Sequence, residues 1–450
     1  MTADLRSIGT LVTAIAIGLT AGQASAQTTA RKPTVALPNT PVGAVVAEWL
    51  EAYNAADSLK LGAYYAKYAL DRSLTAQLNR ARQTGGFEVV SIEKSRPRFM
   101  ELVLRERATE ILNYGVIKMS DEGQPLTLTQ SFVAAVPRGG SIADFKVDAA
   151  ARARVIEAAI AQLDSNYVFP EVAAKMASTV RDRSKRGAYD DVTNGVSLAT
   201  VLTEDFQSVS KDKHLRVNFS VAPIPNRPAN SQPDSAAQER FRQDMIRANC
   251  GFEKTETLAN NVGYLKFNFF ADPEVCGDIA SKEMAKLADV SALIVDLREN
   301  GGGSPAMVAH VSSYLFSKRT HLNDLWERRG NKTTEYWTKP ELPGRKVGDN
   351  VPVYVLTANR TFSGAEEFTY NLKNLKRATI VGETTGGGAH PVSGHRIDDH
   401  FMIGVPFARA INPYSKTNWE GTGVAPDVKV PAADAMTTAL RLISEKKTTP

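Results

Sequence analysis

The spacing of hydrophobic residues predicts helices first and strands afterwards in the N-terminal quarter of the chain. Apolar side chains recur at helical spacing over Val42–Tyr53 and Leu59–Leu70, which predicts two amphipathic helices. Four strand-like stretches follow the glycines at 85 and 86, namely Phe87–Ile92, Phe99–Arg105, Ile111–Met119 and Leu126–Ala134. Helices followed by a run of strands predict a small α+β domain over residues 38–138.

A second helical block follows a linker rich in proline and glycine at Pro137–Ser141. Its apolar residues predict three helices, around Ile156–Leu163, Pro170–Arg181 and Leu198–Phe206. The block contains no pattern of catalytic residue types. We therefore expect a small helical subdomain over residues 144–207.

Strands and helices alternate over residues 208–445, which predicts an α/β core. A loop rich in Pro, Asn and Ser and one helix, about Ser235–Ala248, come first. The clearest predicted strands are Gly263–Phe267, Ala292–Leu297, Val353–Leu356, Thr379–Val381 and Met402–Phe407. The expected fold class is therefore a multidomain α/β (α+β) protein.

The N-terminus has the pattern of an export signal. Arg6 precedes an apolar stretch over Ile8–Leu19, and small residues end at Ala26 in an A-x-A pattern. We expect a signal peptide over residues 1–26 and a polar leader over 27–37. The apolar stretch is too short for a comfortable membrane anchor, and no later segment is long and apolar enough to cross a membrane. The mature protein is expected to be soluble, without stable membrane insertion, in a periplasm or outside the cell.

Composition narrows the classes of partner. The chain is 43% hydrophobic and 23% charged, as in ordinary globular proteins. Its net charge is +5, and the basic residues are interspersed with acidic ones and form no basic run, so a nucleic-acid partner is not expected. In an oxidising compartment Cys250 and Cys276 could form one disulfide. Zinc binding by these two is not expected, because no local His or Cys cluster surrounds them.

Ser363 stands where a buried strand is expected to pass into a helix. The strand is Val353–Leu356, and apolar residues at helical spacing begin at Ala365. A serine beside a helix N-terminus would favour negative charge developing on a substrate oxygen. The sequence from Ser363 to Glu366 also fits a capping box. The local pattern therefore allows a nucleophile or a helix cap.

Serine catalysis also needs a base, a group that orients the base, and donors for the oxyanion. Among the six histidines, local sequence does not separate His214, at the entry to a strand-like stretch, from His395, which follows the glycines at 386–388. Gly301–Gly303, after a predicted strand, could supply backbone donors or simply form a tight turn. Glu420 could be the orienting acid or a solvated loop residue.

Several motifs together resemble the C-terminal processing peptidase family of serine proteases. The motifs are Asp296–Gly303, Thr361–Glu367, Val381–Gly388 and Gly423–Asp427. Two others, Asp212–Val217 and Asn418–Gly421, resemble its branch with tricorn protease cores and the interphotoreceptor retinoid-binding protein. The resemblance runs from about residue 149 to the end and implies a ClpP/crotonase-like protease core over residues 208–445.

The resemblance implies a role for each matching residue. Ser363 matches the nucleophile, His214 the general base and Glu420 the acid that orients it. The N–H groups of Gly364 and Gly302 match the oxyanion hole. No lysine stands among the glycines at 386–388, so the Ser–Lys dyad of the tail-specific members is not expected. Neither a cofactor nor a metal is required, and the interval before the core is too short for a PDZ domain.

These observations lead to one expected function and two alternatives. The expected function is that of an exported serine endopeptidase that hydrolyses peptides or unfolded proteins through an acyl-enzyme on Ser363. The first alternative is a non-catalytic periplasmic binding protein for lipophilic ligands or peptides on the same fold. The second is an interaction protein that recognises its partners through the domain before Gly139. That domain resembles the cone-shaped nuclear-transport-factor-two-like fold, although no specific motif carries this resemblance.

Overall fold

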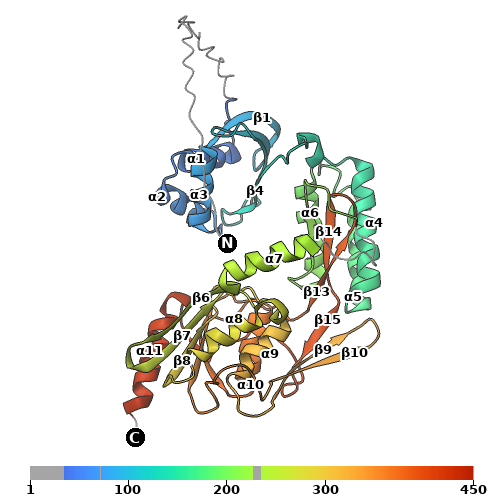
Figure 1. Ribbon diagram of the computed structural model, residues 1–450. Coiled ribbons are helices and arrows are strands. Elements are labelled where there is room, and N and C mark those ends of the chain that lie inside the picture. Colours follow the sequence, from blue (N-terminus) through green and yellow to red (C-terminus); the bar gives the residue numbers. More distant parts are fainter. Residues whose placement is uncertain (1–34, 71, 227–234, 449–450) are drawn as a thin grey trace, which may run out of the picture.

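The computed structural model describes residues 35–70, 72–226 and 235–448. The expected signal peptide and most of the leader lie outside the described residues. Figure 1 shows a small N-terminal domain, a helical part beside it and a larger α/β part. Among the described residues, none of the helices has the length and apolar character needed to cross a membrane.

The N-terminal domain packs three helices on one face of an antiparallel sheet. The helices are α1 (Pro41–Asn54), α2 (Ser58–Lys67) and α3 (Leu74–Thr84). The strands pair in chain order as β1 (Phe87–Arg96), β2 (Phe99–Glu106), β3 (Leu112–Met119) and β4 (Leu128–Ala135). Side chains of Thr40, Asp57 and Ser73 cap the three helix N-termini. The two predicted helices and four predicted strands are confirmed, while the nuclear-transport-factor-two-like fold stays a prediction.

The helical part shares its hydrophobic core with strands from distant sequence. Its helices are α4 (Ala149–Asn166), α5 (Pro170–Lys185) and α6 (Gly195–Ser210). They pack against a sheet of β5 (Arg216–Phe219), β14 (Phe401–Pro406) and β13 (Val392–Arg396). Leu163 and Leu202 lie in one buried cluster with Val217 and Ile403. Packing therefore continues across the expected boundary between residues 207 and 208.

A six-stranded sheet forms the centre of the α/β part. Its order is β16 (Val428–Lys429), β12 (Ala378–Gly382), β11 (Val353–Thr357), β8 (Ala292–Asp296), β7 (Val262–Phe267) and β6 (Phe252–Leu258). All neighbours are parallel except β6 and β7. Helices α8 (Pro273–Ala285), α9 (Pro305–Ser313) and α10 (Gly364–Asn374) pack on one face. Helix α11 (Ala435–Thr448) packs on the other.

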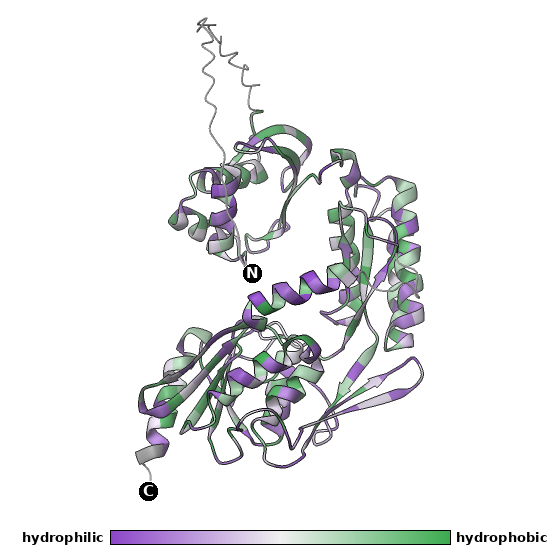
Figure 2. Cartoon of the chain, in the orientation of Figure 1, coloured by the Kyte–Doolittle hydropathy of each residue, from purple (hydrophilic) through white to green (hydrophobic). Residues whose placement is uncertain are grey.

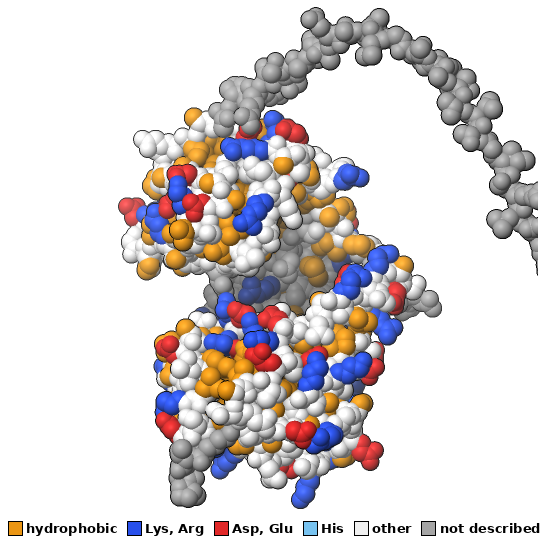
Figure 3. All heavy atoms as spheres, turned by 60° about the vertical axis from the view of Figure 1, so that its left-hand side comes forward, with side chains coloured by type: hydrophobic (Ala, Val, Ile, Leu, Met, Phe, Trp, Pro, Cys, Tyr) orange, Lys and Arg blue, Asp and Glu red, His pale blue; other side chains and the backbone are white. Residues whose placement is uncertain are grey.

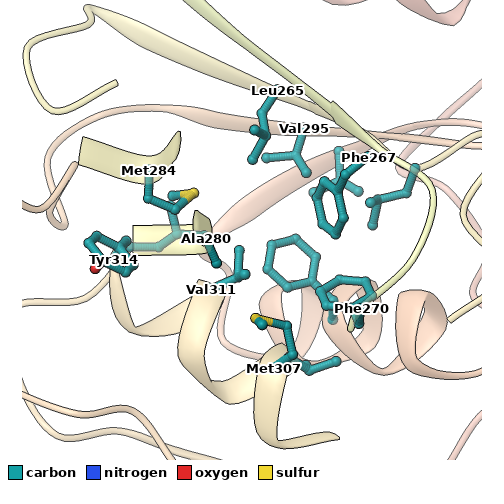
Figure 4. Packing of buried hydrophobic residues seen from close by; sticks show 14 of the residues in the cluster. Leu265, Phe267, Phe270, Ala280, Met284, Val295, Met307, Val311 and Tyr314 are labelled. Carbon is teal, nitrogen blue, oxygen red and sulfur yellow. The ribbon is translucent and has the colours of Figure 1, made fainter. Parts of the chain in front are cut away.

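The core beneath α8, α9 and α10 holds this sheet rigid. Figure 4 shows Phe267 and Val295 of the sheet facing Met284 of α8 and Met307 of α9, with Phe270 between them. A disulfide joins Cys250 to Cys276, and both residues are fully buried in the same core. Because protein interiors are close-packed, the loops that leave the carboxyl ends of β8 and β11 start from fixed positions.

The remaining elements lie at the edge of this body. A small antiparallel sheet contains β10 (Lys332–Trp337), β9 (His321–Glu327) and β15 (Ala408–Ile411). Helix α7 (Ser235–Arg247) has no buried residue and is mostly hydrophilic in Figure 2. On the face drawn in Figure 3, Lys and Arg side chains lie among Asp and Glu side chains. The mixed charges on this face agree with the composition.

Candidate active site

Ser363 caps α10 in a backbone conformation that is unusual for serine. Its φ is 54° and its ψ is −121°, and at this positive φ any residue other than glycine is strained. The preceding Thr361 is fully buried; its hydroxyl donates to the Leu297 carbonyl at 2.8 Å and accepts the Ala358 N–H at 3.0 Å. The turn that presents Ser363 is therefore fixed to the loops that follow β8 and β11.

Glu366 holds this turn against the glycine-rich loop. Its Oε2 accepts the N–H groups of Ser363 at 2.9 Å and Gly388 at 2.8 Å. Its Oε1 accepts the Gly387 N–H at 2.6 Å and the Thr385 hydroxyl. Burial raises the pKa of the Glu366 carboxyl, and these donors oppose the rise. The glutamate half of the predicted capping box is thus present, and it also ties α10 to the loop at 385–388.

The glycines after β8 lie directly against the Ser363 turn. A Cβ placed on Gly302 would lie 2.6 Å from the Gly364 nitrogen and 2.7 Å from Ser363 Cβ, so only glycine fits there. The Gly302 N–H donates to Asn300 Oδ1 at 2.8 Å and is not directed at a substrate in this conformation. The Gly303 nitrogen lies 3.0 Å from the position of a Cβ on Gly364. No acceptor for the Gly303 N–H is found among the described residues.

His214 and Ser363 line the same cavity. The imidazole packs on Phe362 with ring centroids 4.6 Å apart, and Asp212 Oδ1 accepts the His214 backbone N–H at 3.0 Å. Burial lowers the pKa of His214 to about 4, with Asp212 opposing the shift. The ring is therefore neutral near pH 7, as a general base must be. Its buried Nδ1 has no hydrogen-bond partner within the described part of the chain.

Glu420 lies beside His390 and Asp212. Its Oε2 accepts the Ala389 N–H at 2.6 Å and lies 3.5 Å from His390 Nδ1. Its buried Oε1 has no partner in the described residues. Burial, together with repulsion from Asp212, raises the pKa of Glu420 to about 7. The contacts described for the Glu420 carboxyl are with Ala389 and His390, so in this conformation its link to His214 is indirect, through His390 and Asp212.

Sequence reasoning missed the pair formed by Asp212 and His390. Asp212 Oδ2 and His390 Nδ1 are 2.7 Å apart, and both side chains are buried. Asp212, His390 and Glu420 are also residue types that bind metals, and one ligand atom of each lies within 4.8 Å of the others. Asp212 and His390 are already paired with each other by their short contact. His395, the other base considered, lies on β13, where its Nε2 is 2.8 Å from Ser393 Oγ.

The cavity beside Ser363 has a volume of about 490 Å³. Its lining includes the glycines Gly303 and Gly364. Side chains of the small sheet form much of the remaining wall, joined by a tryptophan of the C-terminal loop; they are Leu325, Tyr336, Ala408, Ala410 and Trp419. A concave and largely apolar space with a few polar groups is typical of a ligand-binding site.

Comparison with known proteins places the chain in a family. Residues 261–430 match peptidase family S41, and residues 142–249 match the N-terminal domain of peptidase S41 in eukaryotic IRBP. The two matches together span more than half of the sequence. The protein belongs to peptidase family S41.

Two curated relatives match part of the chain. Tricorn protease homolog 2 of Streptomyces coelicolor is 26% identical over 207 residues, which is 46% of this chain and 15% of the relative. The chloroplastic carboxyl-terminal-processing peptidase 2 of Arabidopsis thaliana is 25% identical over 203 residues, or 43% of this chain and 37% of the relative. The chain thus spans well under two thirds of either relative. A crystal structure of a peptidase from Parabacteroides merdae has a TM-score of 0.46 at 20% identity, covering 65% of this chain and 96% of that one.

Proposed function

We propose that this protein is an exported serine endopeptidase that hydrolyses peptides or unfolded proteins. The observation that carries the proposal is the placement of Ser363 at a strained helix N-terminus. It shares one cavity with a neutral imidazole and a glycine-lined loop. Membership of a peptidase family supports the same function.

The proposed chemistry is acyl transfer in two halves. His214 takes the proton of the Ser363 hydroxyl as the oxygen bonds to a substrate carbonyl carbon. The C–N bond then breaks, and the leaving amine takes that proton from His214. Water repeats the sequence against the acyl-enzyme and restores the serine. No hydrogen bond joins Ser363 and His214 among the described contacts, so substrate binding has to bring them within about 3 Å.

The oxyanion would be held by backbone donors of the two loops that touch. Gly364 supplies one N–H at the start of α10, where the helix dipole adds positive potential. Gly303 offers the second, since Asn300 already accepts the N–H of Gly302. Rotation of Asn300 would free Gly302 as a third donor.

Glu420, Asp212 and His390 act on the charge of the base. Protonation of His214 creates a buried cation during the reaction, and nearby carboxylates stabilise it. Asp212 already raises the pKa of His214 against the effect of burial. In this proposal Glu420 is a positioning and charge-balancing residue, and Glu420→Gln lowers kcat at least tenfold without unfolding the protein.

Export is supported by the N-terminal signal pattern and by the cysteines. The pair Cys250 and Cys276 is bonded in the structure, and such bonds persist in oxidising compartments. Mass spectrometry of protein recovered from the producing cells measures the mature N-terminus. A start at Gln27 fits signal removal, and an intact Met1 in an internal fraction contradicts export.

A fluorophosphonate probe tests the nucleophile. We expect it to label the purified protein, and we expect Ser363→Ala to lose both labelling and cleavage of an unfolded protein substrate. Ser393→Ala serves as the matched control because Ser393 lies on β13 against His395. An unlabelled wild type that binds a fluorescent fatty acid tightly would instead favour the non-catalytic binding protein.

A further inference from the structure

The lining of the cavity beside Ser363 includes a buried carboxyl that the proposed mechanism does not use. Glu367 lines the cavity, is 4% exposed, and has an Oε1 without a partner among the described residues. It lies one helical turn after the nucleophile, and its backbone N–H donates to the Ser363 carbonyl at 2.9 Å. One turn of α-helix advances about 5.4 Å along its axis.

Other buried polar atoms near Glu367 also lack partners. Asn323 on β9 is fully buried and interacts with Glu367, whose pKa it lowers, although neither its Oδ1 nor its Nδ2 forms a hydrogen bond of normal geometry with the described residues. Asn371, one further turn along α10, is fully buried with an unpartnered Nδ2. Leaving a buried polar group unpaired is destabilising. Of these three residues Glu367 lines the cavity, so its carboxyl is the group that a ligand there can reach.

The charges around the cavity favour a cation. Its lining includes the acids Glu367 and Glu327 but no lysine or arginine from the described residues. The nearby Arg409 lies instead against Trp326 and Phe169. The walls are apolar at Leu325 and Ala410, which suits an aliphatic stem. A lysine side chain combines a four-carbon stem with a terminal ammonium.

We propose that Glu367, with Asn323 beside it, binds the basic side chain of the substrate residue whose carbonyl Ser363 attacks. This inference rests on the proposed peptidase function and names its substrate class. The aliphatic stem would cross the apolar wall while the lysine or arginine head reaches the carboxyl one turn below Ser363. Glu367 touches the substrate and determines specificity, and it takes no part in bond breaking.

Binding a cation should release a proton from Glu367. Burial raises its pKa to about 8, with Asn323 opposing the shift, so the carboxyl is largely neutral at pH 7. A bound ammonium favours the ionised form. The other titratable groups around it are Tyr336 of β10, whose pKa burial and Glu367 both raise, and Glu327 of β9. His214 and His390 lie elsewhere on the cavity wall.

The first experiment compares two peptides that differ at one position, with lysine or norleucine before the scissile bond. We expect kcat/KM to favour lysine by about 30-fold or more in the wild type. Glu367→Gln should remove most of this preference, and Glu367→Met should favour norleucine. Glu335→Gln is the matched control, because Glu335 is exposed on β10 and bonds to Trp337. A preference for norleucine in the wild type, or a lysine preference unchanged in Glu367→Gln, overturns the proposal.

A second measurement separates this inference from the proposed function. Calorimetry on Ser363→Ala, in buffers of different ionisation heat, measures binding and proton release without cleavage. The lysine peptide should release close to one proton at pH 7, and the norleucine peptide none. If the fluorophosphonate does not label the wild type but the lysine peptide still binds more tightly than the norleucine peptide, only the proposed peptidase function fails. Equal binding and equal proton release for the two peptides in Ser363→Ala overturn the basic-side-chain site itself.

Discussion

Glu366 and Glu367 are adjacent in sequence, yet substitution by glutamine should loosen the active-site loop at one position and leave it unchanged at the other. Glu366 accepts three backbone N–H groups and one hydroxyl, whereas Glu367 Oε1 accepts none among the described residues. Glutamine keeps the shape of glutamate but replaces one acceptor oxygen with an NH₂ donor. We therefore expect Glu366→Gln to loosen the active-site loop and Glu367→Gln to leave it intact.

The size of the effect follows from the contacts of each oxygen. With NH₂ in the Oε2 position, the N–H groups of Ser363 and Gly388 both lose their acceptor. With NH₂ in the Oε1 position, the Thr385 hydroxyl can rotate to accept, and only the Gly387 N–H is orphaned. The better choice leaves one buried donor unpaired and weakens the remaining bonds, at a cost of about 2–3 kcal/mol. That free energy corresponds to a change of about 30- to 150-fold in a local opening equilibrium.

Hydrogen exchange followed by mass spectrometry measures this opening directly. Peptides that cover residues 384–390 should exchange about 30- to 150-fold faster in Glu366→Gln than in the wild type. Peptides from β7 and β8 should be unchanged and serve as internal references. Exchange within about threefold of the wild type, or equal acceleration in Glu367→Gln, would refute the assignment of Glu366 as the clamp of the loop.

Three further outcomes are expected. Burial raises the pKa of Glu420 to about 7 and lowers that of His214 to about 4, so wild-type kcat/KM should fall as Glu420 is protonated near pH 7, whereas the lower kcat/KM of Glu420→Gln should stay level from pH 7 to about 5; a limb near 6.5 in the profile of Glu420→Gln, where an ordinary histidine titrates, contradicts this. A Cβ on Gly388 would lie 2.3 Å from Phe362 Cζ and 2.6 Å from His214 Cε1, so Gly388→Ala should displace both rings and reduce kcat at least tenfold, while Gly62→Ala, with its nearest contact at 3.6 Å, should leave kcat unchanged. Reduction of the Cys250–Cys276 bond, which spans a separation of 26 residues, should destabilise its part of the chain by about 3–4 kcal/mol; thermal unfolding with and without a reductant measures it, and equal midpoints count against the estimate.

Sequence patterns predicted the elements whose burial is uniform. The runs at β8 and β11 are buried at every position and stand out as apolar stretches of strand length. Helix α3 was not predicted, because only Leu78, Ala81 and Thr84 of its eleven residues are buried and the periodic signal is weak. Strands β9 and β10 were also missed, since their polar residues on both faces hide the alternation.

The site was predictable as a set of residue types but not as a set of contacts. Motif order placed Ser363 and His214 in one function, and both line one cavity. The contact between Asp212 and His390 joins residues 178 positions apart, and no local pattern reports such a separation. The missing partner of Glu367 Oε1 is likewise a property of its surroundings. From sequence alone it is simply the second acid in a helical turn.

The proposed base and the proposed nucleophile belong to two different packed bodies. Leu215, next to His214, is buried with α4, α5 and α6, while Ala365, next to Gly364, is buried with α8 and α9. Each core holds its own residue firmly, so the separation of the two reactive groups depends on how the two bodies are seated against each other. A shift of one ångström at that seam changes the alignment needed for attack without altering either side chain. The rate of the proposed peptidase is thus open to control from any surface that moves one body relative to the other.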